Sequence, residues 1–226
     1  MSLDELAISM TKFFLNIAEK KASTKKSEII GALRDKGVTN QNYLEVFLRA
    51  EKHLTQIFGY SVKEVSVKTS KVLLIVPKDI TSHLVVPPEK QPETTLLYLL
   101  LTYIFMKGND VPELSVIKFL DSLQVSLDDE NHLYFGNVKK HITETFVKQL
   151  YLTRNKIDEE GGTEFIVYYS WGPRSTLELS KKEILDYVST LLNRPAECFV
   201  EQYKEVHGEK SLPNSTQMNK SKRSQR

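Results

Sequence analysis

The sequence has little cysteine and no long apolar run. Cys198 is the single cysteine in 226 residues, so an intramolecular disulfide is impossible and a zinc site would need other ligands. A reducing, intracellular compartment fits this composition. The longest apolar run, near 96–106, is broken by Thr102 and is too short to span a bilayer. The first twelve residues lack the layout of a secretory signal, so we expect no membrane segment.

Recognised catalytic motifs are also missing. The chain has no G-x-S-x-G motif, no phosphate-cradling glycine loop and no H-x-x-x-H spacing among its five histidines. The acidic run 128–130 lacks the alternate spacing of a calcium loop, and we interpret it as a solvated turn. Cys198 lies next to Phe199 and Val200, which is more typical of a packing residue than of a nucleophile. The sequence therefore argues against an enzyme and predicts no metal, cofactor or small-molecule substrate, although catalytic groups can also assemble from distant positions.

Charge is nearly balanced, with a formal net charge of +2. From Gly208 onward there are five basic residues against one acidic residue, which leaves 26 basic and 28 acidic residues in the remainder. The folded part therefore sets up no strong field toward nucleic acid. No apolar pattern continues beyond position 207, so we expect a basic, disordered tail over 207–226. The run 220–226 within this tail would suit nuclear import or DNA tethering.

Apolar spacing divides the chain into two similar units. Four prolines between 77 and 92 predict a linker over 78–93. The first unit, 1–77, is predicted to contain helices over 3–19, 28–34 and 43–58 and strands over 62–67 and 72–76. The second unit, 94–206, is predicted to contain helices over 94–107, 113–123 and 143–150, strands over 133–135, 151–157 and 164–171, and two final helices after Ser180 and Pro195. Two successive helix-plus-hairpin units predict a mostly α fold with small β-hairpins, in tandem winged-helix domains.

The stretch 164–174 is the most distinctive of the chain. A strand rich in aromatic and β-branched residues stops at Gly172-Pro173, and Ser180 with Glu183 can cap the helix that follows. The only tryptophan, Trp171, lies where the strand stops. We interpret Trp171, Gly172 and Pro173 as a structural corner, with the indole as its packing anchor.

This stretch, with Trp171-Gly172-Pro173-Arg174 at its centre, resembles the MAGE homology domain. The resemblance extends through Ile104-Phe105-Met106-Lys107-Gly108-Asn109 and Tyr134-Phe135-Gly136 and covers about residues 3–205. Domains of this family are tandem winged helices, and the ancestral type is a non-SMC subunit of the structural-maintenance-of-chromosomes (SMC) complex used in DNA repair. The resemblance therefore implies a non-catalytic scaffold located in the nucleus and associated with chromosomes.

The resemblance also implies two protein partners. A RING-type E3 ubiquitin ligase subunit, whose activity the family enhances, would bind the first domain through an apolar pair. That pair corresponds to Phe14 and Leu15, the first of which replaces the family's usual leucine. A kleisin subunit would bind an apolar groove on the second domain. The groove is expected at Leu96, Leu97, Leu101, Phe146, Leu150 and Tyr151, although each of these residues could equally belong to the core.

Two other function classes remain open. A winged-helix DNA-binding regulator would place a helix in the major groove. Its phosphate contacts would be Lys139, Lys140, Lys148, Arg154, Lys156 and Arg174. With a nearly neutral folded part, we expect weak, sequence-independent binding that falls steeply with salt. An enzyme with an unrecognised site is the third class.

Overall fold

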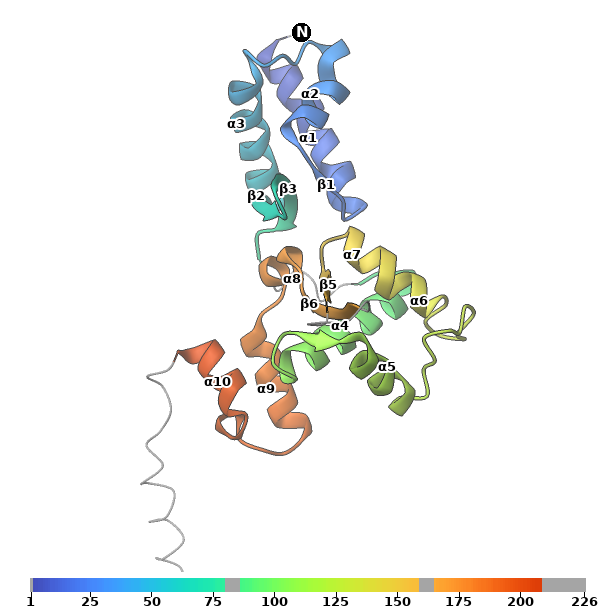
Figure 1. Ribbon diagram of the computed structural model, residues 1–226. Helices are drawn as coiled ribbons and strands as arrows, with labels where there is room; N and C mark the ends of the chain where they lie inside the picture. Colours follow the sequence, from blue (N-terminus) through green and yellow to red (C-terminus); the bar gives the residue numbers. More distant parts are fainter. Residues whose placement is uncertain (1, 80–85, 159–164, 209–226) are drawn as a thin grey trace, which may run out of the picture.

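The computed structural model describes residues 2–79, 86–158 and 165–208. Two units follow one another along the chain and stack end to end, each combining helices with a small sheet (Figure 1). Each unit buries its own apolar cluster, and a third, smaller cluster forms under the last two long helices. The mostly helical fold with small antiparallel sheets confirms the predicted fold class.

The first unit is organised around helix α1 (Leu3–Glu19). A capping box between Ser2 and Glu5 starts this helix, and Leu6, Met10 and Phe14 recur every four residues on its buried face. The remaining elements are β1 (Ser23–Thr24), α2 (Lys26–Leu33), η1 (Arg34–Lys36), α3 (Tyr43–His53), the π-helical turn η2 (Leu54–Phe58), β2 (Tyr60–Val67) and β3 (Ser70–Pro77).

Strand β3 is the centre of the first sheet, which has the order β1-β3-β2. The predicted hairpin is present, with Val62 opposite Ile75 and Val67 opposite Ser70. The two residues of β1 pair with Leu73 and Leu74, in a segment where no element was expected. Two residues carry no periodicity, so only the partner strand could reveal this pairing.

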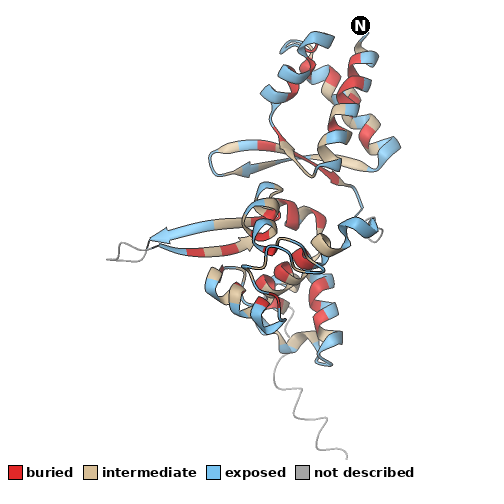
Figure 2. Cartoon of the chain, turned by 90° about the vertical axis from the view of Figure 1, so that its right-hand side faces the viewer, coloured by how far each residue is buried: buried red, intermediate tan, exposed pale blue. Residues whose placement is uncertain are grey.

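The second unit repeats this plan around a sheet of order β4-β6-β5. Its elements are η4 (Pro88–Lys90), α4 (Gln91–Met106), β4 (Val111–Pro112), α5 (Glu113–Ser122), α6 (Val138–Lys140), the π-helical turn η5 (His141–Thr145), α7 (Phe146–Lys148), β5 (Leu152–Asp158), β6 (Phe165–Trp171), α8 (Pro173–Glu178), α9 (Lys181–Leu191), η6 (Ala196–Cys198) and α10 (Val200–His207). The hairpin β5–β6 projects from the body of the molecule (Figure 2). The predicted cap of α9 is present, because the Ser180 hydroxyl accepts from the Glu183 amide at 3.3 Å.

Two expectations for the second unit are wrong, and one helix was not expected. The strand expected over 133–135 is absent, and only an isolated bridge joins His132 to Gly136. Helix α4 begins at Gln91, inside the expected linker, because Pro92 sits in its first turn, where a missing N–H costs nothing. Strand β6 ends at Trp171 as expected, but Pro173 also opens helix α8, for which the sequence indicated no separate element.

Parts of the expected linker and tail lie beyond the described residues, namely 80–85 and 209–226. The expected tail starts at 207, but His207 still belongs to α10. In the part of the chain that the structure describes, no helix is both long and apolar enough to cross a membrane.

The corner after β6 is held by a very close approach of two backbone segments. Trp171 donates its indole N–H to the Leu101 carbonyl at 2.9 Å, and the Gly172 amide donates to the Tyr151 carbonyl at 2.7 Å. A Cβ atom added to Gly172 would lie 2.2 Å from the Leu150 carbonyl oxygen. Only glycine therefore fits at this position, because backbone cannot move aside as a flexible side chain can.

We expect Gly172→Ala to lower the free energy of unfolding by at least about 2 kcal/mol through this overlap. Gly31→Ala is the matched control, because Gly31 is an exposed residue inside α2 with no atom within 4 Å of an added Cβ. That control should stabilise the protein by about 1 kcal/mol. Urea unfolding followed by the fluorescence of Trp171 measures both changes, and similar effects of the two substitutions would contradict the packing described here.

Candidate functional site

The two units meet at Arg174, in the first turn of α8. Its side chain is 1% exposed and crosses from the second unit to the first. The guanidinium donates to the carbonyls of Lys21 and Ala22 at 3.1 and 2.9 Å, and to the Ile75 carbonyl at 3.3 Å. It also donates to the Gln149 carbonyl at 2.8 Å and to the Glu178 carboxylate at 2.9 Å. All five N–H groups of an arginine side chain thus have an acceptor.

This arrangement corrects the expectation that Arg174 contacts DNA. A side chain buried between the units cannot reach a phosphate, and its donors are already used. No sequence pattern indicates this role, because the carbonyl acceptors lie about 25 to about 150 residues away in the chain.

Glu178 and Tyr151 complete the buried polar cluster at the contact between the units. The Glu178 carboxylate accepts from the Arg174 guanidinium through one oxygen and from the Tyr151 hydroxyl, at 2.5 Å, through the other. Burial, with the negative charge of Glu178 beside it, raises the pKa of the Tyr151 hydroxyl. The Lys21 ammonium lies 4.9 Å from the centre of the Tyr151 ring. Desolvation lowers the pKa of Lys21, and the nearby Glu178 charge partly offsets that effect.

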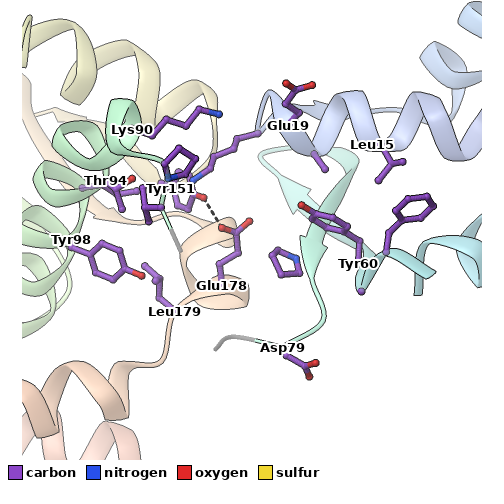
Figure 3. Close-up of a pocket in the computed structure, with 18 residues that line it drawn as sticks. Leu15, Glu19, Tyr60, Asp79, Lys90, Thr94, Tyr98, Tyr151, Glu178 and Leu179 are labelled. Carbon is purple, nitrogen blue, oxygen red and sulfur yellow. Dashed lines mark hydrogen bonds between the residues drawn. The ribbon is translucent and has the colours of Figure 1, made fainter. Parts of the chain in front are cut away.

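A cavity of about 530 Å³ opens beside this cluster and is called here the seam cavity. Figure 3 shows Leu15 and Tyr60 of the first unit across it from Tyr98 and Leu179 of the second. Both polar and apolar side chains line it. The residues lining it are Leu15, Ala18, Glu19, Lys21, Phe58, Gly59, Tyr60, Pro77, Asp79, Val86, Pro87, Lys90, Thr94, Leu97, Tyr98, Tyr151, Glu178 and Leu179.

A second cavity of about 900 Å³ lies on the second unit and is called here the apolar groove. Helices α4, α5 and α9 form its walls, because α4 is apolar on all sides and buries only one face in the core. The lining residues are Val86, Gln91, Thr94, Thr95, Tyr98, Leu99, Thr102, Tyr103, Met106, Phe119, Leu179, Ser180, Glu183, Ile184, Tyr187, Val188 and Leu191. Tyr187 and Leu191 of α9 are 66% and 68% exposed, so the groove is open at the surface.

The structure separates the two residues of the expected RING-binding pair. Phe14 is fully buried in the first core, one helical turn beyond Met10, so it cannot be a contact and this expectation is corrected. Leu15 is half-buried and lines the seam cavity. The difference follows from the helix, in which consecutive residues point about 100° apart.

The expected kleisin residues are also largely core. Five of the six are at most 4% exposed, and these are Leu96, Leu97, Leu101, Phe146 and Tyr151. Leu150 is half-buried in a left-handed conformation, with φ of 65°, where its carbonyl accepts from the Arg174 amide. The groove instead uses the opposite face of α4, which includes Leu99, Tyr103 and Met106. Periodicity could not find that face, because leucine and aromatic residues occupy every side of this helix.

The candidate DNA contacts other than Arg174 do not form one basic surface. The Lys139 ammonium pairs with Asp128 at 2.9 Å, and Arg154 pairs with Glu113 at 3.2 Å. Lys156 lies over the Phe165 ring on the projecting hairpin, at 4.1 Å from its centre. Lys140 and Lys148 are exposed at opposite ends of the helical segment from α6 to α7.

Within the ranges 2–79, 86–158 and 165–208, no group of three or more histidine, cysteine or acidic side chains is placed to hold a metal ion. The Cys198 side chain is exposed on η6, not packed as the sequence suggested.

Comparisons with known proteins identify relatives. The MAGE homology domain matches residues 70–182. The Non-structural maintenance of chromosomes element 3 homolog of Homo sapiens is 33% identical over 208 residues, which cover 89% of this chain and 66% of that protein. Its Mus musculus counterpart is 32% identical, with 87% and 70% covered. MAGE-like protein 2 of Homo sapiens is 33% identical over 92% of this chain but only 16% of its own length.

A solved structure is similar over nearly the whole chain. A chain of the structure described as "Nse1-Nse3-Nse4 complex" superimposes with a TM-score of 0.79 and 28% sequence identity. The superposition covers 90% of this chain and 97% of that one. The similarity therefore includes both units.

We expect Arg174→Met to lower the free energy of unfolding by about 3–5 kcal/mol, because it leaves Glu178 as a buried, partly uncompensated charge. Lys182→Met is the matched control: Lys182 also forms an i,i+4 ion pair, with Asp186, but both side chains are at least half exposed, so no measurable change is expected. Chemical unfolding followed by Trp171 fluorescence compares the two variants. Equal stability of both would contradict a structural role for the buried pair.

Proposed function

Because the chain belongs to the MAGE homology domain family, we propose that it is a non-catalytic scaffold subunit of an SMC complex that maintains chromosomes and repairs DNA. The similarity of both units to a chain of the Nse1-Nse3-Nse4 complex carries this proposal. As a subunit of such a complex, the protein acts in the nucleus, associated with chromosomes. The chain spans only part of most of its curated relatives, 66% in the human element 3 homolog, so its partners belong to the proposal.

The first partner is a RING-type E3 ubiquitin ligase subunit, which we place on the first unit. Leu15 supplies an apolar contact at the mouth of the seam cavity, while Phe14 supports it from the core. The exposed Phe58 side chain, 46% accessible, lies on the same cavity wall and extends the apolar surface. By holding this subunit close to its substrates, the scaffold enhances ligase activity.

The second partner is a kleisin, which we place in the apolar groove. An amphipathic helix lying along α4 and α9 would bury apolar residues every three or four positions. Tyr187 and Leu191 offer exposed anchors, Met106 offers a half-buried one, and Glu183 offers a polar contact. Apolar anchors in such grooves supply most of the binding free energy.

DNA binding is the second candidate function. Two of the six candidate basic residues are paired with acids on the surface, and a third is buried. We therefore expect only weak binding without sequence preference, which falls steeply as salt is raised.

Leu15→Asp should weaken binding of the RING-type subunit by at least about tenfold, because it puts a charge on the proposed contact. Ile8→Asp is the control on the same helix: Ile8 is 48% exposed and does not line the seam cavity. Binding is measured by titration calorimetry with purified subunits. A loss of affinity as large for Ile8→Asp as for Leu15→Asp would contradict this placement.

Leu191→Ala and Met106→Ala should each weaken binding of a kleisin helix by about 5- to 100-fold, the range of interface anchors. Leu123→Ala serves as the control, because Leu123 is 43% exposed but lies outside the groove. Fluorescence anisotropy with a labelled kleisin peptide reports the affinities. Unchanged affinity in both groove variants would place the kleisin elsewhere.

A further inference from the structure

The seam cavity and the apolar groove share one wall, and we infer that occupation of one strengthens binding at the other. Val86, Thr94, Tyr98 and Leu179 line both cavities. The inference rests on the proposed function, because it assigns the RING-type subunit to the seam and the kleisin to the groove. We assign this coupling between the two binding sites to Tyr98 and Leu179.

Tyr98 stands between the two cavities. Thr94 and Tyr98 are four residues apart in α4 and therefore form a ridge on one face of the helix. The Tyr98 side chain is 37% exposed, which leaves its ring accessible to a partner. Burial and then the negative charges of Glu178 and Glu183 raise the pKa of Tyr98. Glu178 lines the seam cavity and Glu183 lines the groove.

Leu179 connects the same wall to the buried cluster that joins the units. It directly follows α8, whose residue Arg174 bonds to the first unit, and its amide donates to the Ser175 carbonyl at 2.9 Å. It also directly precedes Ser180, the cap of α9, which forms the far wall of the groove. A partner that packs on Leu179 therefore contacts a segment that joins the seam cavity to the groove.

The coupling is expected to be favourable because either partner orders the Tyr98 side chain when it binds. A ring that is accessible from two cavities must be fixed when either partner packs against it, and fixing it costs side-chain entropy. The first partner bears that cost, so the second partner binds to a wall that is already ordered. Linkage then requires the kleisin to strengthen RING-subunit binding by the same factor.

The test measures affinity of a kleisin fragment limited to the groove-binding helix, for the full chain alone and for the full chain saturated with the RING-type subunit. We expect at least about fivefold tighter binding in the presence of the second partner, the lower end of measured couplings. Tyr98→Ala should bring this ratio to within about twofold of unity, and Tyr98→Phe, which keeps the ring, should retain it. Leu99→Ala, which alters the groove but not the seam cavity, should weaken the kleisin yet keep the ratio.

Thermal unfolding of each variant verifies that it is folded. A ratio of one or below with the unaltered chain, while both partners bind, would overturn the coupling and leave the proposed function intact. A ratio that survives Tyr98→Ala would overturn the route through this side chain. Failure of either subunit to bind the unaltered chain would overturn the proposed function, and the coupling with it.

Discussion

A single buried guanidinium sets the geometry of the contact between the two units. Burial of the positively charged Arg174 side chain is tolerable only if every donor finds an acceptor and the charge finds a partner. Three carbonyls come from the first unit, one from the second, and the carboxylate is Glu178. Rotation of one unit against the other would break several of these bonds together, which makes the arrangement specific.

Local features of the second unit serve this contact. Gly172 lets the chain pass against the Leu150 carbonyl, and Pro173 starts α8 directly afterwards, so Arg174 points back across the corner. Trp171 fixes the same corner to α4 through its indole N–H. The corner, the buried Arg174 and one residue of the wall shared by the two cavities, Leu179, thus lie within nine consecutive residues, 171–179.

Helix α4 illustrates the limit of pattern analysis. Its sequence predicts a buried helix, and one face does form the second core through Leu96, Leu100 and Ile104. The opposite face, with Leu99 and Met106, lines the groove. Both faces are apolar, so the residues expected in the groove turned out to be core, whereas those facing outward were not named. In α1, by contrast, the clear amphipathic pattern predicted the bounds of the helix.

The sequence by itself determined the family, the mostly helical fold with its two hairpins, and the cap of α9, because these depend on local periodicity and on residues close together in the chain. Only the tertiary structure decided that Arg174 is buried between the two units and is not a surface cation. It also decided that Phe14 belongs to the core while Leu15 is accessible, and that Tyr98 borders two cavities. The physical reason is the same in each case. Burial, hydrogen-bond satisfaction and cavity shape depend on groups that are distant in sequence, and no local pattern records which of them meet.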